Sequence, residues 1–288
     1  MSQPVGGLRH VASDLGFTAS DDVVLVVALA PAPSAGELVA ERLHVTSDGN
    51  GPQPVVTELA GSDGSRMHVV RAGAGDLLIS YAATVRAAEP PAVASPGTDP
   101  DEVAGGLVDA DAITALRQSR FCPSDALAGF AAGEFGGLEA GTDLARAVAA
   151  WVFERIAYEP GSSGPLDTSV DTLLSGAGVC RDFAHLTIAL CRALGVPARL
   201  AAVYAPGLSP MDFHAVVEVR RGGRWEVHDP TRLAPRTSLV RIATGRDASD
   251  TAFATTLSGT IELTTQSVFA VVEGDLPLDD HVEPVALA

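Results

Sequence analysis

The chain has 288 residues, and 47% of them are hydrophobic, which is enough for one large core or two smaller ones. It carries 36 acidic residues against 19 basic ones, a net charge of −17, and none of the basic residues is lysine. A chain this acidic repels nucleic acid and anionic membrane surfaces, so neither is an expected partner.

Cysteine content and hydropathy indicate the compartment. The chain has 3 cysteines, an odd number and too few for a disulfide framework. The start of the chain lacks a basic region followed by an apolar stretch. The longest apolar run, residues 23–33, is shorter than the ~20 residues that span a bilayer. We therefore expect a cytoplasmic location, where a thiol stays reduced.

The first third of the chain alternates short β-like runs with turn clusters. We expect a small antiparallel β domain, β-sandwich-like, over residues 1–88, followed by a proline-rich linker over residues 89–105. The candidate strands are residues 23–30, 41–46, 55–59, 67–71 and 77–86.

Helical spacing follows in residues 106–250, the expected core of the second part of the chain. Thr142 or Asp143 can cap one helix, and a short helix is expected near residues 170–174. A further helix runs from Cys180 to Leu194. Strands are then expected at residues 199–204, 213–220 and 224–228, and the tail, residues 251–288, has one or two strands that can return to an earlier sheet.

Cys180 stands where a loop turns into a helix. Unpaired backbone N–H groups and the helix dipole favour an anion in a first turn, so a thiol there readily becomes a nucleophile. The same N–H groups, including that of Cys180, are natural oxyanion donors. Asp182 would slightly oppose a thiolate and Arg181 would assist it. Cys122 and Cys191 are interpreted as buried structural residues.

A predicted hairpin brings together a histidine and a carboxylate. Two β-rich runs flank the glycines at positions 222 and 223. With a loop of two or four residues, position 221 faces 224 and position 216 faces 229, so His214 and Asp229 lie diagonally on one face, with His228 on the other. A three-residue loop would put His214 and Asp229 on opposite faces.

A cysteine, a histidine and a carboxylate are the groups that nucleophilic acyl transfer needs. The thiolate attacks a carbonyl carbon, the imidazole protonates the leaving group, and the carboxylate orients the imidazole.

These motifs resemble those of the bacterial transglutaminase-like superfamily. The resemblance implies a papain-like α+β core, in which the cysteine helix packs on an antiparallel sheet, with Cys180 as nucleophile, His214 as base and Asp229 as orienting residue. The family includes crosslinkers, peptidases, deglycosylating amidases and inactive members. The residues that carry the resemblance are 178–185, 212–219 and 229–232, with flanking signatures at 120–125 and 245–250.

The leading hypothesis is thiol-dependent hydrolysis of an amide in a peptide or protein substrate, with no cofactor and no metal. A crosslinking or deamidating transglutaminase is the alternative within the enzyme class. A non-catalytic binding protein that keeps the fold is the alternative outside it, and a zinc site formed by Cys180, His214 and Asp229 lacks a fourth ligand. The sequence favours no particular oligomeric state.

Three further side chains receive an interpretation. His185 lies about 140° around the helix from Cys180, which favours a structural hydrogen bond. Some crosslinking relatives use a tryptophan as a second oxyanion donor, but Trp151 has apolar neighbours that favour core packing. Tyr204, at the end of the strand before His214, is the other candidate donor.

Overall fold

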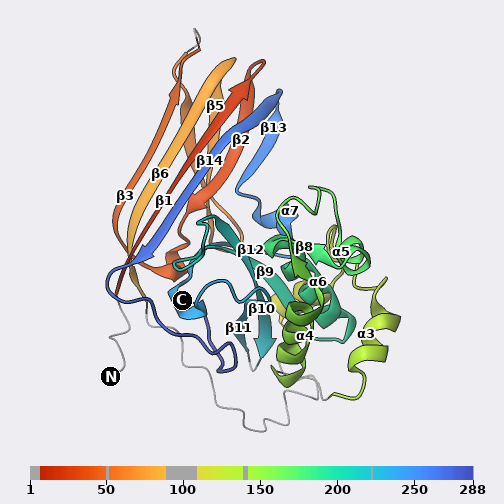
Figure 1. Ribbon diagram of the computed structural model, residues 1–288. Helices are drawn as coiled ribbons and strands as arrows, with labels where there is room; N and C mark the ends of the chain where they lie inside the picture. Colours follow the sequence, from red (N-terminus) through yellow and green to blue (C-terminus); the bar gives the residue numbers. More distant parts are fainter. Residues whose placement is uncertain (1–6, 50–51, 89–108, 139–141, 222, 288) are drawn as a thin grey trace.

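The structure is a computed structural model that describes residues 7–49, 52–88, 109–138, 142–221 and 223–287. A β-sandwich and a helix-covered sheet lie side by side in it (Figure 1). The fold class expected from the sequence, α+β with a preceding β-sandwich, is confirmed. The predicted linker, residues 89–105, lies outside the described residues.

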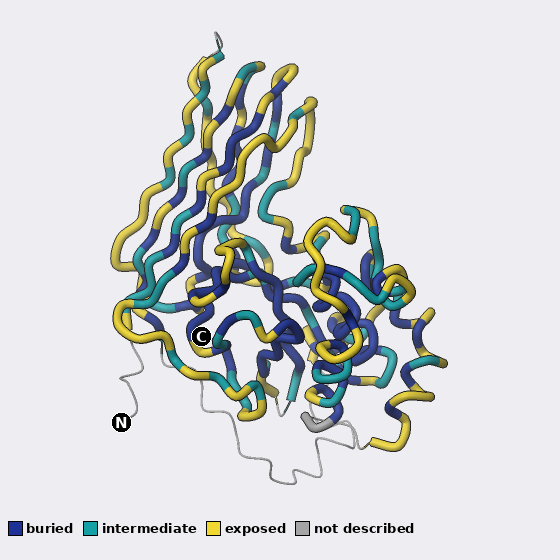
Figure 2. Tube along the Cα trace, in the orientation of Figure 1, coloured by how far each residue is buried: buried dark blue, intermediate teal, exposed yellow. Residues whose placement is uncertain are grey.

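The sandwich consists of two four-stranded antiparallel sheets, ordered β14-β1-β6-β3 and β13-β2-β5-β4. Its strands are β1 (Leu8–Ala19), β2 (Val23–Ala30), β3 (Gly36–Ser47), β4 (Val55–Ala60), β5 (Arg66–Ala72), β6 (Gly75–Ala87), β13 (Ala254–Ser258) and β14 (Ile261–Val272). Residues alternate between the core and solvent along β6, as expected for a strand with one face on a core (Figure 2). The structure thus contains every strand predicted in this part, and adds β1, which the sequence analysis did not list.

The tail returns to the sandwich. β14 pairs with β1, and β13 pairs with β2, so both sheets join chain segments from opposite ends of the sequence. A β domain made of N-terminal strands alone would lack one edge strand in each sheet.

The second part is a four-stranded antiparallel sheet, ordered β11-β10-β9-β12. One face packs against helices α4 and α6, and α3 packs on α6. Residues near the C-terminus pack in a separate cluster with other residues of the sheet. The elements of this part are α2 (Ala110–Leu116), α3 (Ala128–Phe135), α4 (Thr142–Arg155), β7 (Ala157–Tyr158), α5 (Ser169–Ser175), β8 (Ala177–Gly178), α6 (Cys180–Ala193), β9 (Ala198–Tyr204), β10 (Phe213–Arg221), β11 (Arg224–His228), β12 (Val240–Gly245) and α7 (Ala248–Thr251), with short 3-10 turns at Pro33–Ala35 and Arg236–Ser238. Within the described ranges, no helix combines the length and the apolar character needed to cross a membrane.

The hairpin of β10 and β11 has the predicted register. Arg221 pairs with Arg224, and Val217 pairs with His228. The parity argument that puts His214 and Asp229 on one face is therefore confirmed.

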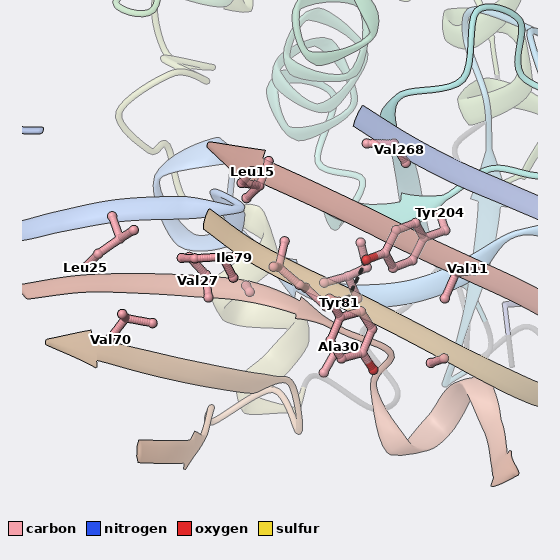
Figure 3. Packing of buried hydrophobic residues seen from close by; sticks show 14 of the residues in the cluster. Val11, Leu15, Leu25, Val27, Ala30, Val70, Ile79, Tyr81, Tyr204 and Val268 are labelled. Carbon is pink, nitrogen blue, oxygen red and sulfur yellow. Dashed lines mark hydrogen bonds between the residues drawn. The ribbon is translucent and has the colours of Figure 1, made fainter. Parts of the chain in front are cut away.

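Strand β9 joins the two parts. Its last residue, Tyr204, is fully buried in the sandwich core among residues such as Val11 and Tyr81 (Figure 3). The Tyr204 hydroxyl donates to the Leu29 carbonyl at 2.9 Å and lies 3.2 Å from the Ser13 hydroxyl. The suggestion that Tyr204 is an oxyanion donor is therefore wrong, because its hydroxyl is used inside the sandwich.

Replacing Tyr204 by Phe should destabilise the fold without disabling the thiol. The change leaves the buried Leu29 carbonyl without its donor, and we expect a loss of about 1–2 kcal/mol in the free energy of unfolding, measured with urea. Tyr158→Phe removes the same atom from a ring that is 42% exposed, and serves as the stability control. Unchanged stability together with lost Cys180 alkylation in Tyr204→Phe would contradict this assignment.

Candidate active site

Cys180 is the first residue of α6, and the local sequence builds that helix start. The Val179 N–H donates to Asp182 Oδ2 at 2.9 Å, which caps the helix. Gly178 permits this approach, because a Cβ there would lie 2.6 Å from the Asp182 Cβ. Asp182 in turn pairs with Arg181 at 2.8 Å. The expected opposing effects of these two charges on a thiolate are therefore largely balanced within one ion pair.

The three cysteines differ in accessibility. All are free thiols, but Cys180 is partly exposed whereas Cys122 and Cys191 are completely buried. Burial raises the pKa of both buried thiols to about 12. The interpretation of Cys122 and Cys191 as structural residues is confirmed, since neither can ionise near neutral pH.

The carboxylate and imidazole predicted to meet do so in a buried pair. His214 Nε2 and Asp229 Oδ2 are 3.0 Å apart, and both side chains are fully buried. The other oxygen of Asp229 accepts from the backbone N–H of Thr231 at 2.9 Å and from its hydroxyl at 2.7 Å. Both carboxylate oxygens of Asp229 thus have hydrogen-bond partners, which fix the orientation of the side chain.

The electrostatics of the pair favour an ionised state. Burial alone would lower the pKa of His214, but the charge and hydrogen bond of Asp229, with a contribution from Cys180, raise it to about 10. Burial works to raise the pKa of Asp229, but His214 and Thr231 lower it. The pairing therefore favours the charged form of each side chain, an imidazolium on His214 and a carboxylate on Asp229.

The remaining ring nitrogen of His214, Nδ1, is buried and has no hydrogen-bond partner in the described part of the chain. Cys180 is close enough for its thiol to act on the pKa of His214. Since Asp229 occupies Nε2, Nδ1 is the nitrogen left for exchange with a sulfur or a reacting group.

Tyr158 is a neighbour of Cys180 that the sequence analysis missed. Strand β7 pairs with β8, which aligns Tyr158 with Gly178, two residues before the cysteine. The pKa of Tyr158 is raised to about 12, mainly by burial and further by the charge of Cys180. A hydrogen bond from the backbone N–H of Cys180 acts in the opposite direction and lowers this pKa. The Tyr158 hydroxyl thus lies beside the N–H expected to serve as oxyanion donor. Tyr158 lies in a two-residue strand, which is too short to be recognised from a sequence pattern, so nothing local marked it as part of the site.

Trp151 belongs to the core, as expected. Its ring packs edge-on against Phe130 and Phe135, with centroids 5.5 and 6.0 Å away, and its N–H donates to Glu134. It is not available to a substrate oxyanion.

His185 holds two flanking segments against α6. Its Nε2 accepts from the Ala248 N–H at 3.1 Å, and its ring stacks on Phe121 with centroids 5.2 Å apart. Asp247 accepts from the Phe121 N–H at 2.8 Å. Burial lowers the pKa of His185 to about 4, which keeps the ring neutral as this acceptor role requires. The structural role predicted for His185 is confirmed.

His228 also stays out of the chemistry. It is buried, and burial lowers its pKa to about 3, helped by the charges of Arg236 and Arg146. Among the described residues, no three His, Cys, Asp or Glu side chains converge in a way that could hold a metal ion.

A cleft of about 560 Å³ opens onto Cys180 and His214 at the boundary of the two parts. Pro165 and Asp212 line it from loops that precede α5 and β10. The sandwich and α7 also line the cleft, which no local pattern in the sequence indicates. The wall residues from these elements are Ala28, Ala254, Thr255 and Gln266, with Ala248, Ser249 and Thr251.

Comparisons with known proteins agree with this arrangement. The sequence profile described as "Transglutaminase-like superfamily" matches residues 129–230. A crystal structure of a "Putative Cysteine Protease" from Cytophaga hutchinsonii is 31% identical in sequence, with a TM-score of 0.87, and the match covers 100% of this chain and 99% of that one.

A curated protein is also similar. It is an uncharacterized protein of Mycobacterium leprae, 33% identical over 119 residues, which are 37% of this chain and 41% of the relative. The chain thus matches less than half the length of that relative.

Replacing Asp229 by Asn should neutralise His214. The change removes the carboxylate that raises the pKa of His214, while burial continues to lower it. The imidazolium should therefore persist to about pH 10 in the wild type and be lost before pH 7 in the variant, as measured by NMR titration of labelled histidine rings. The charge-matched control is Asp111→Asn on the exposed start of α2. A ring still protonated at pH 8 in Asp229→Asn would show that Asp229 does not hold the charge.

Proposed function

Because this chain belongs to the transglutaminase-like superfamily, we propose that it is a thiol-dependent enzyme that hydrolyses an amide bond of a peptide or protein. Cys180 is the nucleophile, His214 the acid–base group and Asp229 the orienting carboxylate. The observation that carries the proposal is the buried His214–Asp229 pair beside a partly exposed thiol at a helix start.

The reaction proceeds in two transfers. The sulfur of Cys180 bonds to the substrate carbonyl carbon, the C–N bond breaks, and His214 Nδ1 gives its proton to the leaving amine. Water then attacks the thioester and gives a proton to His214, the C–S bond breaks, and a carboxylic acid leaves. Asp229 keeps Nε2 protonated and stabilises the imidazolium whenever it is present.

The oxyanion of each tetrahedral intermediate needs donors. The backbone N–H of Cys180 points from the positive end of α6, where such donors are expected. The hydroxyl of Tyr158 lies beside that N–H and is the proposed second donor.

The Cytophaga protein, whose match covers the whole of this chain, is named a "Putative Cysteine Protease". That name favours hydrolysis over crosslinking. A reducing cytoplasmic setting suits a mechanism with three free thiols. A crosslinking enzyme would use the same thioester and replace water by an amine.

Iodoacetamide at pH 6 tests the nucleophile directly. We expect Cys180 to alkylate at least tenfold faster than free cysteine, because an adjacent imidazolium stabilises a thiolate. Cys122 and Cys191 serve as controls in the same molecule, since burial raises the pKa of each to about 12. Mass spectrometry of the digested protein gives all three rates. Equal rates for Cys180 and free cysteine would favour a non-catalytic binding protein.

The products formed from peptides distinguish hydrolysis from crosslinking. A peptide library should be cleaved by the wild type and not by Cys180→Ala, which should unfold at the same urea concentration. Addition of a small primary amine reports transfer, because a crosslinking enzyme would yield an amide product instead of an acid. Cleavage retained in Cys180→Ala would rule out the proposed nucleophile.

A further inference from the structure

Arg120 lines the cleft that contains Cys180 and His214, and it is exposed there. Its guanidinium lies over the Phe121 ring, 5.2 Å from the centroid. No carboxylate in the described part of the chain lies within ion-pair distance of it. The chain carries a net charge of −17, and Arg120 presents a positive charge to the cleft without a carboxylate partner among the described residues.

The other arginine of the cleft is already occupied. Arg181 pairs with Asp182, and the same guanidinium donates to the Gly164 carbonyl at 2.7 Å. Among the described residues that line the cleft, only Arg120 therefore offers a guanidinium free to bind an incoming anion.

Arg120 is held in place by its neighbour. Phe121 is fixed through its backbone N–H to Asp247 and through its ring to His185 on α6. A guanidinium resting on a fixed ring has fewer conformations to lose when it binds a carboxylate, and its planar fork can bind both oxygens.

The reach from the nucleophile suits a peptide. His185, which stacks on Phe121, lies five residues after Cys180, or ~7.5 Å along α6. An extended peptide advances ~3.3 Å per residue, so two or three residues cover the stretch of α6 between Cys180 and the residue that stacks on Phe121, the ring beneath Arg120.

The remaining lining defines the rest of the ligand. The rings of Phe213 and Phe253 stack with centroids 5.0 Å apart, and both line the cleft. Asp212 is the carboxylate that lines it, and its Oδ1 accepts from the Phe213 N–H and from Gln266. The cleft thus combines an apolar wall with one cationic position and one anionic position.

We propose that Arg120 is the anion subsite of this cleft, so that the preferred substrates carry a carboxylate two or three residues from the scissile amide. The proposal rests on the proposed function, because it uses the same nucleophile. The carboxylate can be the chain terminus or an acidic side chain.

Matched alkylating peptides test the subsite. Iodoacetyl-Gly-Gly with a free carboxylate is compared with its carboxamide, and the rate at Cys180 is measured for each at low ionic strength. We expect the carboxylate-to-carboxamide rate ratio to fall about three- to tenfold in Arg120→Gln. Arg117→Gln, an exposed position outside the cleft that changes the net charge equally, should keep the wild-type ratio.

The measured rates distinguish failure of the anion subsite from failure of the proposed function. A ratio that is the same in wild type and Arg120→Gln overturns the subsite, while rapid reaction with the carboxamide preserves the proposed function. No accelerated reaction of Cys180 with either probe overturns both. Iodoacetyl-Gly-Glu-amide distinguishes the sources, since a ratio that depends on Arg120 with this probe assigns the subsite to acidic side chains.

Discussion

The buried pair of His214 and Asp229 is the interaction that constrains the rest of this structure. Removing two charged groups from water costs several kcal/mol for each, and only close pairing and further hydrogen bonds compensate. Here the pair is 3.0 Å apart, and Thr231 supplies two more bonds to the carboxylate. A shift of the hairpin by one residue would leave both charges buried and unpaired. The register of β10 and β11 is therefore coupled to the chemistry of the site, and an intact pair implies an intact hairpin.

This coupling explains why the pairing of His214 with Asp229 could be predicted from the sequence. Strand side chains alternate with a period of two, so a two-glycine turn decides which residues share a face. The helix start at Cys180 was also predictable, because a glycine before it, an acidic residue in its first turn and apolar residues at helical spacing are all local signals. The geometry of the His214–Asp229 pair therefore depends on few long-range assumptions.

Other features could not be predicted because they depend on contacts distant in the sequence. Strand β1 places Ser13 and Gly16 among its apolar residues, so its alternation is weak, although Ser13 is buried beside Tyr204. Its edge partner β14 lies more than 240 positions further along the chain. Tyr204 looked available to the site because its strand leads there, but a residue at a strand end can turn to either part of the protein. Tyr204 is buried in the core of the sandwich, and no local sequence pattern indicates this burial.

The two parts of the protein contribute differently to the cleft. Cys180, His214 and Asp229 all lie in the helix-covered sheet, whereas one wall comes from β2, β13 and β14 of the sandwich. Gln266 of β14 donates to Asp212, two residues before His214, so the wall is tied to the catalytic strand by a hydrogen bond. The hydrogen bonds to the side chain of Asp229 come from His214 and Thr231 and not from β13 or β14, so outward residues of these strands can change without disturbing the charges of the pair. Under the proposed function, substrate choice can vary in the sandwich while the proposed acyl-transfer chemistry stays fixed in the hairpin, which gives a physical reason for joining a β-sandwich to this core.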